Sequence, residues 1–316
     1  MKKIKIILFC VFLVFAGIIL FFIPAKNVFA ETKSLMSWRM VSVSKDFTEA
    51  DAKLTAEIYR KRLLNLGLKE NVFVIYTEKN SVVVKVKNVL PHSDQYDNIV
   101  KALTVEGHLA FWETFGRIEA GRFLYNAFDD KNVMGKFQKM ISIDPQDTLM
   151  INNFSPRIGF VKETDTAWVS SIFDSLNTIK KLPANLEFAW SKENQETHKN
   201  EFGLIALKAE ADGKPALDKP KLMDASLAKS KYNPTPEISM VMDSAAALKW
   251  EGITHRNINR SLAIVYDGKV ISYPAVMGEI KGGRSQISGV FTIKEAAEIV
   301  SMLKTEPLPS RMIISH

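Results

Sequence analysis

Residues 262–272 read LAIVYDGKVIS, and this stretch decides the fold of the chain. Two short runs rich in β-branched residues flank the dipeptide Asp267-Gly268. A two-residue hairpin turn of type I′ needs a positive φ at both positions, which Gly adopts without strain and Asp tolerates better than most residues. The stretch therefore predicts an antiparallel β-hairpin with Asp267 and Gly268 in its turn.

The hairpin belongs to a longer alternation of strands and helices in the last third of the chain. Thr292 and Glu295 have the spacing of a capping box, and apolar residues follow at helical intervals. The expected elements are a strand at 238–242, a helix from Ser244, the two hairpin strands, a strand at 286–288, a helix from Thr292 and an edge strand at 312–314.

The first third of the chain shows the same order. Thr48 caps a helix that Gly67 ends, and Ser93 begins a second helix. The order β-α-β-β-α-β is the ferredoxin-like pattern, and it predicts two related halves. The expected elements are strands at 38–44, 72–75, 82–86 and 108–114 with the two helices between them.

These two halves define the domain organisation that we expect. The halves, 31–115 and 236–316, form one α+β base, and residues 116–235 form a small α/β head inserted between them. Within the insertion, a helix is predicted near 166–176, with short strands near 158–161 and 204–208. A linker rich in Pro and Gly is predicted over 211–236.

The first thirty residues have the pattern of a membrane segment. Lys2, Lys3 and Lys5 precede an uncharged apolar run from Ile6 to Ile23, which is long enough to cross a bilayer. The lysines predict a cytoplasmic N-terminus, so the remainder would lie outside a bacterial cytoplasmic (inner) membrane. Alternatively, cleavage after Ala30 would release the chain into the periplasm.

Charge and cysteine content exclude several functional classes. The net charge is +7, but the first thirty residues contain four Lys and no acidic residue. The remainder is therefore only mildly basic, which argues against nucleic-acid binding. The single cysteine, Cys10, lies in the apolar run, so no disulfide is expected.

No pattern of catalytic or metal-binding residues emerges. Ser226 and Lys229 match a Ser-x-x-Lys pair, but the Lys-Thr-Gly partner of that motif is missing. Gly282-Gly283-Arg284 has neither a Walker lysine nor dinucleotide spacing, and Asp129-Asp130 fits a solvated loop. We therefore expect no enzyme, no metal and no cofactor. The five histidines lie at unrelated spacings: His92, His108, His198, His255 and His316.

The tryptophans divide into two groups. Trp112, Trp190 and Trp250 lie in strand-like or helical contexts and are expected in the core. Trp168 lies on the amphipathic helix of the insertion. It is either a core residue or a contact for a bound polypeptide.

Several stretches resemble the first extracytoplasmic domain of the SecD family, which assists the Sec translocon. The resemblance is strong in the last third, good in the first third and loose in the insertion. The matching stretches are 261–274 (SLAIVYDGKVISYP), 282–289 (GGRSQISG), 291–296 (FTIKEA), 58–63 (IYRKRL), 66–68 (LGL), 105–113 (VEGHLAFWE), 158–161 (IGFV) and 204–208 (LIALK).

The resemblance implies a fold and a role. It implies a base of two ferredoxin-like halves and a mobile inserted head that grips emerging polypeptide. Movement of the head against the base would hinder backsliding. The implied partners are Sec translocon components and unfolded secretory polypeptides. The residues carried over from the family are turn-formers and not catalytic: Asp267, Gly268, Gly282, Gly283 and Gly289.

The chain also departs from the family pattern. In SecD, further membrane helices follow the segment matching Pro309 and couple proton flow to transport, whereas this sequence stops at His316. We therefore expect no proton coupling by that route, and passive capture of polypeptide instead. Two functions remain open: a SecD-like accessory of export, and a stand-alone extracytoplasmic interaction or chaperone-like domain.

Overall fold

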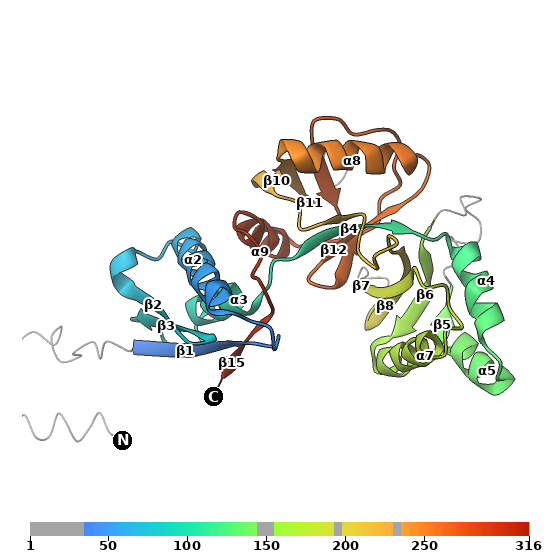
Figure 1. Cartoon of the computed structure of the whole chain (residues 1–316), viewed down its shortest axis with the longest axis horizontal. Coiled ribbons are helices and arrows are strands. Elements are labelled where there is room, and N and C mark those ends of the chain that lie inside the picture. Colours follow the sequence, from blue (N-terminus) through green and yellow to red (C-terminus); the bar gives the residue numbers. More distant parts are fainter. Residues whose placement is uncertain (1–34, 144–154, 193–197, 230–234, 316) are drawn as a thin grey trace, which may run out of the picture.

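The computed structural model describes residues 35–143, 155–192, 198–229 and 235–315 (Figure 1). The predicted membrane segment from Ile6 to Ile23 and the alternative cleavage site at Ala30 lie outside these residues. Among the described residues, no helix combines the length and apolar character that a membrane crossing requires.

The fold is mixed α+β and consists of three lobes, each with an apolar core of its own (Figure 1). The first lobe contains β1 (Leu35–Ser42), α2 (Glu49–Asn65), β2 (Phe73–Glu78), β3 (Ser81–Lys87), α3 (Asp94–Thr104) and β15 (Met312–Ser315). The central lobe contains β4 (Leu109–Thr114), β9 (Leu217–Asp218), β10 (Leu222–Lys229), β11 (Pro236–Met242), α8 (Ser244–Arg256), β12 (Leu262–Tyr266), β13 (Lys269–Ser272), β14 (Arg284–Ser288) and α9 (Ile293–Leu303). The inserted lobe contains α4 (Arg117–Ala127), α5 (Lys131–Met140), β5 (Ile141–Ser142), β6 (Arg157–Lys162), α7 (Thr166–Thr178), β7 (Leu186–Lys192) and β8 (Glu201–Lys208).

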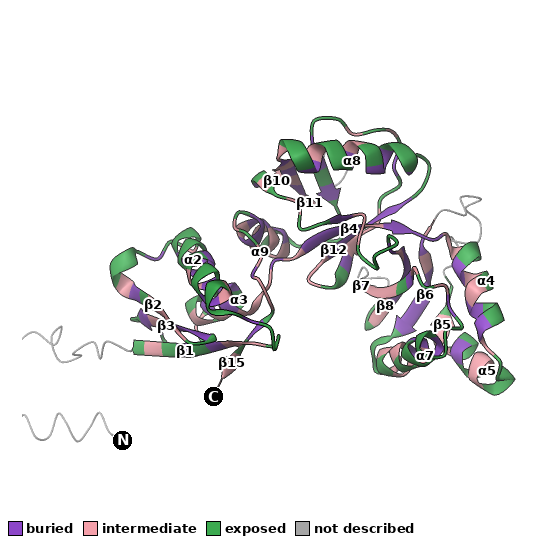
Figure 2. Ribbon diagram, in the orientation of Figure 1, coloured by how far each residue is buried: buried purple, intermediate pink, exposed green. Residues whose placement is uncertain are grey.

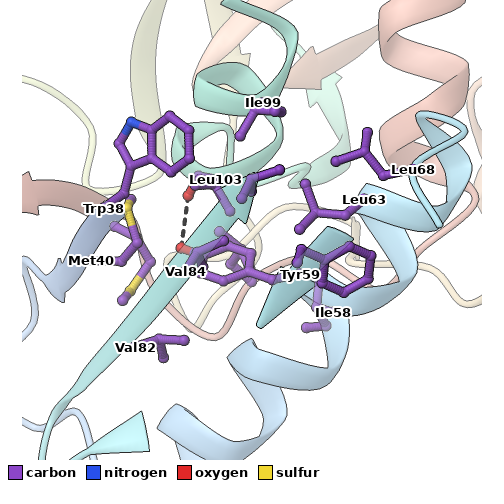
Figure 3. Close-up of a cluster of buried hydrophobic side chains, with 14 of the residues drawn as sticks. Trp38, Met40, Ile58, Tyr59, Leu63, Leu68, Val82, Val84, Ile99 and Leu103 are labelled. Carbon is purple, nitrogen blue, oxygen red and sulfur yellow. Dashed lines mark hydrogen bonds between the residues drawn. The ribbon is translucent and has the colours of Figure 1, made fainter. Parts of the chain in front are cut away.

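The first lobe packs α2 and α3 against a four-stranded antiparallel sheet. Thr48 caps α2 as predicted and forms a capping box with Asp51, and Gly67 follows the end of the helix with φ +83°. Apolar side chains of both helices meet the alternating Val82, Val84 and Val86 of β3. Figure 3 shows this core, in which the Tyr59 hydroxyl donates to the Leu103 carbonyl at 2.7 Å.

The last strand of the chain completes the first sheet. The strand order is β15-β1-β3-β2, and Arg39–Ser42 pairs with Met312–Ser315. β4, the last strand of the first β-α-β-β-α-β pattern, instead pairs with β12 of the central lobe. The structure thus has the predicted element order but does not confirm two ferredoxin-like halves, because the final strand of each pattern pairs elsewhere. Alternation predicts a strand and its buried face, whereas the neighbour of that strand depends on tertiary packing.

The region predicted as a linker contains two strands. Leu217 and Ala225, on β9 and β10, are buried in the core of the central lobe. β10 pairs along most of its length with β11, and α9 packs on it. The linker prediction over 211–236 is therefore wrong for residues 217–229. Short runs of small residues such as DASLAK carry too weak an alternation to reveal a strand.

A large sheet joins the inserted lobe to the central lobe. It runs β5-β6-β8-β7-β13-β12-β4-β9, and an additional pairing of β8 with β4 closes five of these strands into a ring. One apolar cluster takes side chains from all five, including Ile205, Val265 and Val270, with Trp112 and Ala189 against them. Figure 2 shows β4 buried along most of its length, while the outer faces of α4 and α8 are exposed. The two lobes therefore share a continuous core.

Candidate functional site

The first and central lobes are connected by two chain segments, and one buried arginine binds both. Arg62, in the last turn of α2, is fully buried. Its guanidinium donates to the carbonyls of Ala102 (2.9 Å), Val105 (2.5 Å) and Glu106 (2.8 Å). Its Nε donates to the Thr305 hydroxyl at 3.2 Å. Arg62 therefore fixes the segment between α3 and β4 to the segment between α9 and β15.

The packing around Arg62 leaves no space for a side chain at Gly107. Gly107 has φ +80°, and a Cβ there would lie 2.9 Å from a guanidinium nitrogen of Arg62. The Leu308 amide donates to the Glu106 carbonyl at 2.9 Å, which adds a direct bond between the two segments. Burial lowers the pKa of Arg62, an effect that Tyr266, Tyr59 and Asp267 oppose. An arginine nevertheless stays charged, because its ordinary pKa lies far above neutral pH.

The hairpin turn of the central lobe meets the same segment. Asp267 has φ +48° and Gly268 has φ +77°, the conformation expected of a type I′ turn. The Asp267 carboxylate accepts from the amides of His108 (2.7 Å) and Gly107 (3.3 Å). Burial raises the pKa of Asp267, although these two amides favour its charged form. Asp267 thus positions the start of β4 as well as forming a turn.

Two polar side-chain contacts cover this junction on its solvent side. His108 Nε2 lies 2.5 Å from an Asp218 carboxylate oxygen, and Lys219 Nζ lies 3.3 Å from the Glu106 carboxylate. These contacts connect the segment between α3 and β4 to Asp218 of β9 and to Lys219, the residue after β9. They are partly exposed, so each contributes little to stability.

An apolar groove of about 440 Å³ lies between the first and central lobes. The first lobe contributes side chains from the end of α2 and from α3, and the central lobe contributes the hairpin and one face of α9. Its lining is chiefly apolar and includes Leu66, Val105, Ile271, Val290, Phe291 and Met302.

One polar atom in this groove has no partner. The Tyr266 hydroxyl is buried and makes no hydrogen bond to the described residues. Burial is the main cause of the raised pKa of Tyr266, so the phenol stays protonated and remains a donor. A buried hydroxyl without an acceptor costs about 1–3 kcal/mol. Tyr266 thus lines the groove and has a buried hydroxyl without a partner among the described residues.

A second, polar cleft continues from the apolar groove. It has a volume of about 470 Å³ and shares Asn98, Lys101 and Lys294 with the groove. Asp94 and Asp97, in the first turn of α3, line its far side. Together the two form a trough with one apolar and one polar part.

The structure places Trp168 in the inserted lobe, far along the chain from the groove. It lies on α7, half-buried against the apolar core, with the Lys136 ammonium 4.3 Å from its ring centroid. Phe173 stacks on Phe188 at 4.0 Å in the same core. On α4, Tyr125 is 68% exposed. The lobe thus presents aromatic side chains at and near its surface.

The predicted turn residues Gly282, Gly283 and Gly289 lie around β14. Gly282 and Gly283 have φ values of +71° and +65°, and a Cβ on Gly283 would lie 2.7 Å from Ala247 Cβ. Gly289 has no positive φ, but a Cβ there would contact the Phe291 ring and the Ile271 carbonyl. These residues allow close backbone approach and do not converge on a ligand.

The other candidates from the sequence are scattered. Ser226 and Lys229 both lie exposed on β10, and Asp130 caps α5 while Asp129 pairs with Lys181. In the part of the chain that the structure describes, no three His, Cys, Asp or Glu side chains converge as metal ligands. Trp250 is buried as predicted and donates to the Ser285 hydroxyl at 2.8 Å.

A second network, centred on the Glu113 carboxylate, connects two strands of the ring to α8. The Glu113 carboxylate on β4 accepts from Arg256 (2.5 Å), Asn257 (3.1 Å) and Lys208 (3.2 Å). Burial alone would raise the pKa of Glu113, but these three donors outweigh it and hold the pKa below its usual value. The network fixes α8 to β4 and β8.

Sequence reasoning missed Arg62, Tyr266 and the groove. One signal was present for Arg62: it lies three residues after Tyr59, on the apolar face of the predicted helix. Its basic neighbours, Arg60 and Lys61, made the segment resemble an exposed stretch. Nothing in the sequence indicated that α9 would face α3, so the groove had no local signal.

Comparisons with known proteins identify what these lobes resemble. The family model for the SecDF P1 head subdomain matches residues 194–310. The protein translocase subunit SecD of Rhodothermus marinus is 31% identical over 155 residues, which are 48% of this chain and 24% of that protein. The protein translocase subunit SecDF of Thermus thermophilus is 33% identical over 118 residues, which are 37% of this chain and 16% of that protein. The matched residues thus cover about a quarter or less of the length of each relative.

Solved structures show the same fold. A crystal structure of SecDF in a super-membrane-facing form has a TM-score of 0.56 at 19% identity, over 90% of this chain and 30% of that one. A structure reported for a membrane component SecDF that enhances protein export has a TM-score of 0.54 at 21% identity, over 89% of this chain and 98% of that one. At these identities the likeness concerns the fold alone.

Proposed function

We propose that this chain, which contains a SecD-type P1 domain, assists Sec-dependent protein translocation on the extracytoplasmic side of the membrane. The observation that carries the proposal is the match of residues 194–310 to the SecDF P1 head subdomain. Relatives named as protein translocase subunits support it over overlapping parts of the chain. The partners would be exported polypeptide and Sec translocon components.

The domain arrangement is part of this proposal. The sequence predicts a base of 31–115 and 236–316 with a head at 116–235. The strand pairing favours a refinement, in which the first lobe alone, completed by β15, is the ferredoxin-like base. The central and inserted lobes, joined by the ring of strands, would then form the head. The family match supports this division, because the residues that match the head subdomain, 194–310, begin before β8 and continue through α9.

Contact with polypeptide is proposed for the inserted lobe. Its aromatic side chains at and near the surface, with Trp168 half-buried and Tyr125 mostly exposed, suit binding of unfolded segments. Attachment to the membrane through Ile6 to Ile23 is proposed from the sequence, with release after Ala30 as the alternative. Mass analysis of the mature N-terminus after cell fractionation distinguishes the two.

Photocrosslinking in living cells tests the function. A photoreactive amino acid replaces Tyr125 in the full chain, and another well-exposed position on the first lobe, Val74, serves as the control. We expect crosslinks to secretory precursors or Sec subunits from position 125 and few from position 74. Crosslinks to exported polypeptides without any Sec subunit would favour a stand-alone chaperone-like role. If position 125 captures neither class, the export function is wrong.

A further inference from the structure

A cleft of about 360 Å³, separate from the trough, is lined by four lysines. Lys61 lies on α2, Lys219 and Lys221 lie between β9 and β10, and Lys304 directly follows α9. None of the residues that line this cleft also lines the trough. Three parts of the chain that are distant in sequence thus bring basic side chains to one opening, which we call the lysine cleft.

The lysine cleft has an excess of positive charge. Its lining contains one carboxylate, that of Glu306, against the four lysines. A second carboxylate, that of Glu106, lies 3.3 Å from the ammonium of Lys219. The other three lysines are exposed and form no ion pair with any described residue. Two carboxylates against four ammonium groups leave the cleft positive.

The buried guanidinium of Arg62 adds to this positive charge. It donates to the Thr305 hydroxyl, and Thr305 lines the lysine cleft. The trough differs, because its Lys101 ammonium is neutralised by the Glu298 carboxylate at 2.7 Å. Like charges at short distance repel one another, and a bound anion removes that repulsion. The lysine cleft is therefore suited to an anion, whereas the trough is not.

The other walls of the lysine cleft favour a small phosphate compound. Leu109, Leu222 and Leu303 line it beside the lysines, and apolar walls lower the local dielectric constant and strengthen the attraction of an anion. A lysine ammonium has three donors and binds phosphate as a point charge. The volume is at the lower end of the range for ligand pockets, so one phosphate group with a short organic part fits and a nucleic-acid strand does not.

We propose that the lysine cleft binds a phosphate group, which Lys61, Lys221 and Lys304 contact, with the adjoining carbon atoms against Leu109 and Leu303. Two sources carry this chemistry: a soluble phosphate compound, and the phosphodiester headgroup of an anionic phospholipid. The inference goes beyond the proposed function and does not depend on it, because no polypeptide contact enters the argument.

The first arm of the test is isothermal titration calorimetry of inorganic pyrophosphate into the full chain, held in nanodiscs of phosphatidylcholine. The variants are Lys221→Gln and Lys304→Gln, separately and together. Lys87→Gln, at an exposed position at the end of β3, is the matched control, because it removes the same charge outside the cleft.

We expect each single substitution in the cleft to weaken pyrophosphate binding by about three- to tenfold, which is the usual contribution of one hydrogen bond. The double substitution should abolish saturable binding, and Lys87→Gln should leave it unchanged. Without ligand, the melting temperature of the double variant should not fall, because both side chains are exposed and their removal relieves repulsion between like charges. A merely destabilised variant is thereby distinguishable.

The second arm distinguishes the two sources of phosphate. A photoreactive amino acid replaces Glu306 in the full chain, in nanodiscs that contain phosphatidylglycerol and phosphatidylcholine, and mass spectrometry identifies the adducts. Met277, which is 85% exposed and lies outside the cleft, is the control position. Phosphatidylglycerol adducts at position 306 that disappear with the double substitution identify a lipid headgroup. Pyrophosphate binding without such adducts identifies a soluble phosphate compound.

Two outcomes overturn the inference. One is the absence of both saturable pyrophosphate binding and phosphatidylglycerol adducts at position 306. The other is an equal loss of pyrophosphate binding in Lys87→Gln and in the cleft variants, which would reduce the effect to the net charge of the chain. Neither outcome affects the export function, which the crosslinks from position 125 test separately.

Discussion

At the scale of single residues, Arg62 stands out because its charge is compensated by neutral groups. Three carbonyls and a hydroxyl accept from it, and no carboxylate contacts it directly among the described residues. All four acceptors lie in or beside the two segments between the lobes. The geometry of the guanidinium, with five donors in one plane, suits this role, and a lysine could not replace it.

Replacement of Arg62 tests its importance. Arg62→Met keeps the apolar stem but removes the guanidinium donors to the carbonyls of Ala102, Val105 and Glu106, of which the last keeps the Leu308 amide. We expect the free energy of unfolding to fall by about 3 kcal/mol. Urea unfolding monitored by circular dichroism measures the change.

The matched control is Arg60→Met, two residues earlier on α2. Arg60 is half exposed and pairs with Glu70 at 3.3 Å, so its loss should change stability by less than about 1 kcal/mol. Equal effects of the two substitutions would contradict the role assigned to Arg62.

At the scale of elements, helices and hairpins could be predicted from local patterns, and strand partners could not. Each of these elements is indicated by at most four neighbouring residues. Helices begin after Thr48 and Thr292, and a hairpin turns at Asp267-Gly268, as predicted. β4 and β15 were found as strands, yet each pairs across a large sequence separation. Pairing of that kind depends on packing between lobes, which periodicity does not encode.

The candidate site residues likewise divide into those that a local pattern indicates and those that depend on contacts between elements. Trp168 and the turn glycines could be named from the sequence because each belongs to one element. Arg62 and Tyr266 act between elements, through carbonyls and an unfilled groove that only the assembled lobes create. The Glu113 network likewise joins β4, α8 and β8 from distant parts of the chain.

The Glu113 network predicts a pH dependence. The folded pKa of Glu113 lies below its ordinary value, so its ionised form stabilises the fold above the unfolded pKa, and this stabilisation is lost as the pH falls through the folded pKa. At pH 7, we expect Glu113→Gln to reduce the free energy of unfolding by about 2 kcal/mol. The difference from the unmodified chain should shrink steadily as the pH is lowered through the acidic range.

Urea unfolding at a series of pH values provides the measurement. Glu57→Gln, at an exposed position on α2, is the control and should change stability by no more than about 0.5 kcal/mol at pH 7. A Glu113→Gln difference that stays constant or grows toward low pH would show that the carboxylate does not stabilise the network.

At the scale of the whole molecule, the connections between lobes are unequal. The inserted and central lobes share the ring of β8, β7, β13, β12 and β4 and its apolar core. The first lobe joins the rest through two segments, the contacts of Arg62 and the Lys101–Glu298 pair. Any change in relative orientation is therefore expected between the first lobe and the other two, where the trough also lies.

The C-terminal strand provides the final test of this arrangement. Among the described strands, β15 pairs only with β1, and Met312 is buried in the core of the first lobe. Deletion of residues 312–316 leaves Arg39–Ser42 without partners on one side and opens that core. We expect amide hydrogen exchange to accelerate at least about tenfold in β1, β3 and α3, with α7 and β8 of the inserted lobe unchanged, because stability is divided among cooperative units. Ile313→Ser keeps the backbone pairing at a partly exposed position and should have a much smaller effect. Acceleration spread equally over all three lobes would mean that they unfold as one unit, and the first lobe would then not be a separate base.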